Sequence, residues 1–221
     1  AEMLKEYDPA STSPDEVMSF LQGVNSGADR LRRLIENFIC LVEIDNGEAG
    51  KTVNWRKRPV SDMTFLTDDA IRQVTNPDTR PRTYVVNIQD DLPTPELDVQ
   101  YMTIVMRELL DNASKFSFED GVITLDVSAQ GDQLVISIHD TGRGIAEHEL
   151  AKIWQPFYQI ERELFEDQGS GSGLTIVKGI VEYHHGTCTV DSTLGEGSTF
   201  TIKMPLKVAV QTPIASHEGV N

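Results

Sequence analysis

The sequence has few basic residues, only two cysteines and no long apolar run. Its 221 residues include 19 Lys and Arg against 35 Asp and Glu, a formal net charge of −16. This surplus of negative charge repels nucleic acid and anionic membrane surfaces, so we expect no nucleic-acid partner. A site for an anionic ligand must therefore be built locally, from backbone N–H groups, a few basic side chains or a metal ion.

The cysteines and the hydropathy exclude further classes of protein. Cys40 and Cys188 lie far apart and match no metal-ligand spacing, so we interpret them as reduced core thiols. No apolar run approaches the roughly 20 residues of a membrane-spanning helix, and the first residues do not resemble a signal peptide. We expect a soluble, cytoplasmic fragment. Because it opens on Ala1 inside a helical pattern, we interpret it as cut from a longer polypeptide. A membrane anchor upstream in that parent protein is an open alternative.

What is present begins with a long helical pattern. Hydrophobic residues make up 39% of the chain, enough for a packed core. Ser13 to Glu16 reads as a helix start, with a capping serine, a proline in the first turn and a glutamate that completes a capping box. Beyond it, apolar residues recur at alternating spacings of four and three, as in a heptad repeat: Val17, Leu21, Val24, Ala28, Leu31, Ile35, Phe38 and Val42. The repeat predicts a helix of an antiparallel hairpin or dimeric bundle, and one amphipathic helix packed on its own domain is the alternative.

The remaining chain predicts a second region of mixed structure. Residues 1–7 would end a preceding helix, 8–12 form a turn, and 46–50 read as a helix stop and linker. Beyond Lys51, helical patterns occupy about 61–75, 97–116, 147–154 and 173–184, and strand patterns 82–88, 121–129, 132–139, 187–193 and 198–204. Gly131 falls at a hairpin turn. The prediction is an α+β fold, a two-layer α/β sandwich in which helices cover a mixed sheet, preceded by a helical-hairpin segment.

The first segment with chemical potential is the helix around residues 107–116. At about 100° per residue, Glu108, Asn112 and Lys115 fall within about 60° of one another, beside an apolar arc. The amide oxygen of Asn112 is a hard ligand of the kind that completes the coordination of a Mg²⁺ held also by phosphates. A solvated polar helix face would show the same pattern.

Three glycine-containing turns follow. Asp140 ends a strand and precedes Gly142 and Gly144, so its carboxylate could accept a hydrogen bond from an adenine amine; a plain Asp-Gly turn is the alternative. Alternate glycines from Gly169 to Gly173 open a helix, where N–H groups and the helix dipole favour phosphate. No Gly-Lys-Ser/Thr follows, so this is not a P-loop. Residues 195–200 would by themselves be only a hairpin.

The order and spacing of these segments are far more specific than any one of them. The series resembles the sequence boxes of sensor histidine kinases, within the ATPase superfamily that includes type II topoisomerases, mismatch-repair ATPases and large heat-shock chaperones. The matching segments are Glu108–Phe116 (N box), Asp140–Gly144 (G1), Trp154–Phe157 (F), Gly169–Gly173 (G2) and Gly195–Phe200 (G3). The heptad helix resembles the second helix of the family's dimerisation and phosphotransfer hairpin. The resemblance therefore divides the chain into a partial hairpin (1–48), an ATP-binding catalytic domain (49–206) and a tail (207–221).

The resemblance also implies roles for individual residues, with ATP and Mg²⁺ as the cofactors. Asn112 would ligate Mg²⁺, Glu108 and Lys115 would act in catalysis, and Lys115 would contact the phosphates. Residues 158–168 look like a mobile lid, in which Arg162 is a weakly supported γ-phosphate contact. The expected nucleotide-binding residues are Asn112, Lys115, Phe116, Asp140, Gly142, Gly144, Ile145, Phe157, Gly169, Gly171, Gly173, Leu174 and Ser198. The implied partners are a second copy of the chain, bound through the N-terminal helix, and the receiver domain of a response regulator.

One departure from the family pattern limits what the chain can do. The family's acceptor histidine lies on the first hairpin helix, yet residues 1–48 contain no histidine. His148-Glu149 imitates the acceptor motif but falls between the G1 and F boxes, so we interpret His148 as a surface residue. The expected function is that of the donor half of a histidine kinase, which binds ATP without phosphorylating itself. An ATPase that uses Glu108 as general base toward water, and a non-catalytic nucleotide-sensing dimerisation module, are the alternatives.

Overall fold

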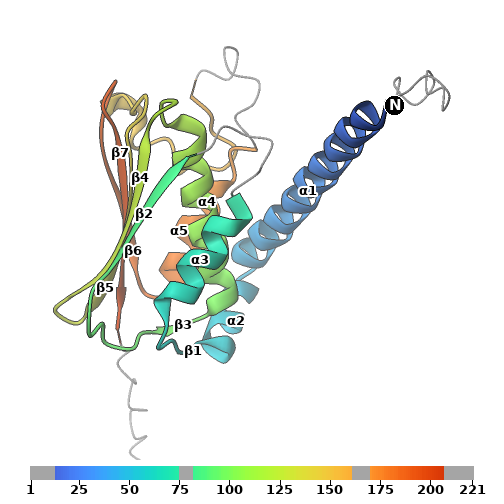
Figure 1. Cartoon of the computed structure of the whole chain (residues 1–221). Coiled ribbons are helices and arrows are strands. Elements are labelled where there is room, and N and C mark those ends of the chain that lie inside the picture. The colour runs from blue at the N-terminus through green and yellow to red at the C-terminus, as the bar shows by residue number, and fades with distance from the viewer. Residues whose placement is uncertain (1–12, 75–81, 161–169, 207–221) are drawn as a thin grey trace, which may run out of the picture.

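The computed structural model describes residues 13–74, 82–160 and 170–206. A long helix, α1 (Pro14–Asp45), projects from a globular part made of one sheet with helices on one of its faces (Figure 1). The helices on the sheet are α3 (Met63–Val74), α4 (Val99–Phe116) and α5 (Gly173–Tyr183), and α2 (Glu48–Arg56) joins α1 to them. The predicted two-layer α+β fold is confirmed.

The main sheet has five strands in the order β2-β4-β5-β7-β6. These are β2 (Thr83–Ile88), β4 (Val122–Gln130), β5 (Gln133–Asp140), β6 (Thr187–Thr193) and β7 (Gly197–Pro205). Strand β2 runs parallel to β4 and the other neighbours are antiparallel, so the sheet is mixed. Gly131 forms the β4–β5 hairpin with a φ of +63°. A two-stranded pair, β1 (Arg58–Pro59) with β3 (Glu96–Leu97), was absent from the predicted elements.

The core lies between the sheet and its three covering helices. Alternate residues of β4, β5 and β7 face this layer, and each helix turns an apolar arc toward it, as the two periodicities require. Fully buried members include Leu66, Met102, Met106, Leu109, Leu110, Ile123, Leu125, Leu134, Ile136, Ile138 and Ile176. Because α4 packs against both α3 and α5, it is the central helix, and its polar edge is held in a fixed place.

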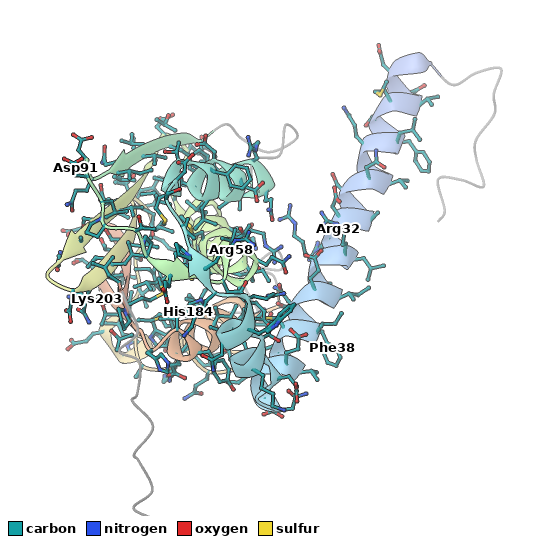
Figure 2. The ribbon with its side chains drawn as sticks, turned by 90° about the horizontal axis from the view of Figure 1, so that it is seen from below. Arg32, Phe38, Arg58, Asp91, His184 and Lys203 are labelled. Carbon is teal, nitrogen blue, oxygen red and sulfur yellow. The ribbon has the colours of Figure 1, made fainter. Side chains whose placement is uncertain are left out.

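Helix α1 begins as its sequence predicts. The Ser13 hydroxyl accepts from the Glu16 N–H, and the Glu16 carboxylate accepts from the Ser13 N–H. The C-terminal half packs on the globular part through Cys40, which is buried, and Ile44. The apolar residues of the predicted heptad lie on its uncovered side, and Phe38 is 65% exposed there (Figure 2). No helix among the described residues has the length and apolarity to span a bilayer.

Two predicted elements differ from the structure. Residues 48–50 were predicted as linker but form the first turn of α2, because Gly47 (φ +76°) reverses the chain and the helix then buries Ala49 and Val53. The predicted helix 147–154 is a 3₁₀ turn, η2 (Glu147–Glu149), followed by irregular turns. Pro156 disfavours helical backbone in the residue before it, and the Glu149 carboxylate is bound by Lys152 and Tyr158 instead of facing solvent.

The remaining predictions concern the two cysteines, His148 and residues outside the described ranges. Cys40 and Cys188 are both free thiols, but Cys188 is only half-buried. His148 is exposed in η2. The expectations for residues 1–12, Arg162, Gly169 and the C-terminal tail lie outside the described ranges.

Candidate functional site

A cavity of about 970 Å³ opens between α4, the turn after β5, the start of α5 and helix α1. It collects most of the residues that the sequence assigned to a nucleotide: Glu108, Asn112, Lys115, Phe116, Asp140, Gly144, Ile145, Gly171, Gly173, Leu174 and Ser198. Gly142 does not line the cavity and lies beside the Phe116 carbonyl and the Asp140 carboxylate. Phe157 is 63% exposed and does not line the cavity.

Asp140 is the buried polar group of this cavity. It ends β5, is 3% exposed, and its Oδ1 has no hydrogen-bond partner among the described residues. Burial raises the pKa of Asp140 to about 6, although nearby His139 and a backbone hydrogen bond from Ser198 act in the opposite direction. A buried acceptor without a donor is costly, so this oxygen is a ready partner for an N–H group of a ligand.

The turn after Asp140 is packed against the β6–β7 turn, backbone to backbone. Gly144 has a φ of +65°, and a Cβ there would lie 2.0 Å from the Thr193 carbonyl oxygen. The Gly195 N–H donates to the Arg143 carbonyl at 2.7 Å, which ties the two turns together. The G1 and G3 segments, some 50 residues apart in sequence, thus form one wall.

Two serines link the parts of this wall through hydrogen bonds. The Ile145 N–H donates to Ser192 Oγ at 2.8 Å, and Ser192 Oγ lies 3.0 Å from Ser198 Oγ. Ser198 is buried opposite Asp140 in the β5–β7 ladder. The Asp140 and Ser198 side chains therefore lie on the same face of the sheet, and both line the cavity.

The polar edge of α4 supplies the next group of side chains. Asn112 is half-buried and lines the cavity, and the Lys115 ammonium pairs with the Asp111 carboxylate one turn earlier. At the end of the helix, the Arg143 guanidinium stacks 4.3 Å from the centre of the Phe116 ring. The predicted edge of acid, amide and amine is present, with a cation–aromatic pair at its C-terminal end.

The start of α5 closes the cavity on another side. Gly171 has a φ of +72° and its carbonyl accepts from the Phe157 N–H at 3.0 Å, so the residues before and after the predicted lid are joined at their base. A Cβ on Gly173 would lie 2.5 Å from Glu108 Oε2. The glycine at this position lets the first turn of α5 approach the α4 carboxylate closely.

Glu108 belongs to a polar cluster between α1 and α4, formed by Glu36, Asn37, Arg107 and Glu108. Glu108 Oε1 accepts from Asn37 Nδ2 at 3.2 Å and from Arg107 at 3.1 Å. The buried Arg107 also donates to Glu36 and to Asn37 Oδ1, both at 3.1 Å. The Glu108 side chain is only 12% exposed, so one of its oxygens is already committed to holding α1 against α4.

Sequence reasoning missed the contribution of α1 and of two arginines. Arg107 directly precedes the N box and Arg143 lies inside the G1 box, but these motifs do not specify either side chain. Arg33 and Asn37 lie on α1, where the heptad pattern drew attention to the opposite side of the helix. Among the described residues, no three His, Cys, Asp or Glu side chains are placed to hold a metal by themselves.

Comparison with known proteins identifies relatives of the chain. The family described as histidine kinase-, DNA gyrase B- and HSP90-like ATPase matches residues 98–208. The non-motile and phage-resistance protein of Caulobacter vibrioides is 31% identical over 85% of this chain and 22% of its own length. The sensor histidine kinase ZraS of Escherichia coli is 30% identical over 96% of this chain and 43% of its own length. The chain thus spans less than half of these relatives.

A solved structure shows the same fold over most of the chain. Full-length ShkA in complex with AMPPNP superimposes with a TM-score of 0.67, covering 88% of this chain and 40% of that one, at 22% identity. The likeness extends beyond the segment that matches the family, which begins at residue 98. The arrangement of helices and sheet is therefore shared with ShkA.

Proposed function

The chain belongs to the family of histidine kinase-, DNA gyrase B- and HSP90-like ATPases, and from this premise we propose that it is the ATP-binding catalytic part of a sensor histidine kinase. It donates the γ-phosphate of ATP to a histidine that residues 1–48 do not contain, for relay to an aspartate of a response regulator. Because the chain spans only part of its relatives, the activity of the whole protein is included in this proposal.

The single observation that carries the proposal is the unpartnered Asp140 Oδ1 at the buried end of the cavity. An ionised carboxylate accepts hydrogen bonds only, and the exocyclic amine of adenine is a donor of the right kind. Phe116 and the wall formed by the turns at Gly142 and Gly144 flank this position. Adenine bound there would satisfy an acceptor that has no donor among residues 13–74, 82–160 and 170–206.

The phosphate end lies along α4 and the start of α5. Lys115 offers a cation, and the first turn of α5 offers N–H groups and the positive end of its dipole. The amide oxygen of Asn112 fits Mg²⁺, which takes few protein ligands when phosphates and water supply the rest; when bound, Mg²⁺ would neutralise phosphate charge. In phosphoryl transfer the protein contributes mainly positioning and charge neutralisation. Asn112, Lys115 and these N–H groups would therefore position the phosphates and neutralise their charge.

The partners follow from the same proposal. The exposed apolar side of α1, including Leu31, Ile35 and Phe38, would be covered by a second copy of the chain in a helical bundle. The phosphorylated histidine would then serve a receiver domain. Since MgATP and receiver domains are cytoplasmic, the domain would act on that side of the membrane.

Phosphate transfer to a supplied histidine tests the proposal. The chain is incubated with γ-³²P-ATP, Mg²⁺ and a separately prepared phosphoacceptor hairpin of a sensor histidine kinase, and acid-labile label on the hairpin is measured. We expect label on the hairpin, none on the chain, and none on either with Asp140→Ala. Rapid release of inorganic phosphate without label would establish an ATPase instead. Saturable ATP binding with neither outcome would indicate a nucleotide sensor.

A further inference from the structure

Helix α1 forms one wall of the cavity that the ATP-binding domain opens. Three of its arginines, Arg30, Arg32 and Arg33, line this cavity together with Asn112 and Lys115. The chain has only 19 basic residues and a net charge of −16. A group of three cations opposite the proposed phosphate end is therefore a local reversal of the overall charge.

The arginines differ in what they face. Arg32 lies between Asp29, at 3.3 Å, and Glu36, at 3.0 Å, and is 62% exposed, so its charge is balanced on its own helix. Arg33 reaches across to the other helices. Its Nη2 donates to the Gln73 carbonyl at the end of α3, at 3.1 Å, and its Nη1 lies 4.0 Å from Asp111 Oδ1 on α4.

Arg33 and Lys115 share one carboxylate. Lys115 pairs with Asp111 Oδ2, and Arg33 approaches the other oxygen. These three side chains carry a net charge of +1, and the neighbouring cluster of Glu36, Asn37, Arg107 and Glu108 carries −1. A phosphate group that entered here would meet a guanidinium already oriented by Gln73 and Asp111, and the planar guanidinium suits phosphate oxygens.

Position along α4 indicates which phosphate this would be. Phe116 marks the adenine end, and a helix rises about 1.5 Å per residue, so Asp111 lies about 7 Å further along the axis. Arg33 therefore lies beyond Asn112 and Lys115 as seen from Asp140. We assign this position to the terminal phosphate of ATP, which extends further from the adenine than the last phosphate of ADP.

Resting on the proposed function, we infer that Arg33 of α1 is a ligand of the terminal phosphate of ATP, so that α1 completes the nucleotide site. A nucleotide with three phosphates would then bind more tightly when α1 is docked on α4, and ADP would be insensitive to the docking. The competing role for Arg33 is a structural one, in which it only joins α1 to α3 and α4.

Calorimetric titration of the full chain with MgATP and MgADP separates these roles. For Arg33→Gln, we expect the Kd for MgATP to rise about tenfold, the lower range for a lost hydrogen bond to a charged group, and the Kd for MgADP to change by less than about twofold. Arg33→Lys should recover part of the MgATP affinity. Arg58→Gln is the matched control, because Arg58 is an exposed arginine outside this cavity, and it should bind both nucleotides as the wild type does.

Three results would overturn the inference. Unchanged MgATP affinity in Arg33→Gln would remove the phosphate contact. Equal weakening of both nucleotides would assign Arg33 the structural role, and circular dichroism melting would show the accompanying loss of stability. If the wild-type chain bound neither nucleotide, the proposed function would fail together with the inference, whereas normal wild-type binding with either of the first two results would leave the proposed function intact.

Discussion

Asp140 combines burial, an unpartnered oxygen and a raised pKa in one side chain. An apolar residue would fill its position at the end of β5 without the cost of burying a carboxylate. The protein keeps a polar group here, and the described part of the chain supplies no donor for Oδ1. Such a group is expected where a ligand completes the hydrogen bonding, which is why the nucleotide assignment depends more on this residue than on any glycine.

The raised pKa of Asp140 has a consequence for stability. Its ordinary pKa is 3.8, and burial raises it to about 6, so between these pH values the folded state holds a proton that the unfolded state has released. Stability contributed by the protonated carboxyl is therefore present below pH 3.8 and is lost as the pH rises through about 6. A shift of this size corresponds to about 3 kcal/mol.

Asp140→Asn removes the titrating group and keeps the shape. We expect the free energy of urea unfolding of the nucleotide-free variant to gain about 2 kcal/mol on that of the wild type between pH 4 and pH 7. The fixed cost of a buried amide is the same at each pH and cancels in this comparison. Parallel pH profiles for the two proteins would mean that the carboxyl is not buried as described.

At the scale of the site residues, the sequence predicted the motif side chains and missed those without a motif. Asn112 and Asp140 were predicted from the spacing of their segments, and both line the cavity. Asn37 and Arg33 could not be found, since their meaning comes only from the way α1 docks on α4. The catalytic role of Glu108 stays a prediction, and its contacts with Asn37 and Arg107 also give it a part in that docking.

At the scale of elements, the contact between the G1 and G3 turns is the feature that holds the wall of the site. Gly144 and Gly131 have nearly equal φ values, +65° and +63°, but differ in their surroundings. A Cβ on Gly144 would meet the Thr193 carbonyl at 2.0 Å, whereas a Cβ on Gly131 would have nothing within 4 Å. The pair separates backbone conformation from steric contact.

Alanine substitutions at these two glycines measure that contact. Gly131→Ala should lower the free energy of unfolding by about 1 kcal/mol, the cost of left-handed backbone alone. Gly144→Ala should lower it by about 2 to 4 kcal/mol, because a clash with backbone is added, and should also weaken MgATP binding. Chemical denaturation and calorimetry measure both quantities. Equal losses of stability in the two variants would show that the turns are not packed as described.

Elements were predictable where local pattern determined them. Long periodic helices and the paired strands followed from spacing, with ends that moved by one or two residues. Helix α2 was missed because Gly47 and Gly50 favour a linker by composition, while burial of Ala49 and Val53 against the globular part makes the segment helical. The helix predicted at 147–154 does not form, because its local pattern is helical but Lys152 and Tyr158 bind the Glu149 carboxylate in a turn.

At the scale of the whole molecule, α1 has two different sides. One side packs along α4 and α5 through the cluster of Glu36, Asn37, Arg107 and Glu108 and through Ile44, which touches Gly179. The other side exposes Leu31, Ile35 and Phe38. The helix thus connects the surface proposed for a second copy with the cavity proposed for ATP, and the heptad pattern could predict only the first of these.

The most direct test of the central claim is a calorimetric titration of the wild-type chain with MgATP near neutral pH, beside Asp140→Ala and the control Asp126→Ala. Asp126 is also a strand carboxylate, but it pairs with Asn87 and lies outside the cavity. We expect one ATP per chain for the wild type and for Asp126→Ala, and no measurable binding for Asp140→Ala with its melting transition retained. Undiminished binding by Asp140→Ala, or no binding by the wild type, would contradict the claim that this cavity is an ATP site.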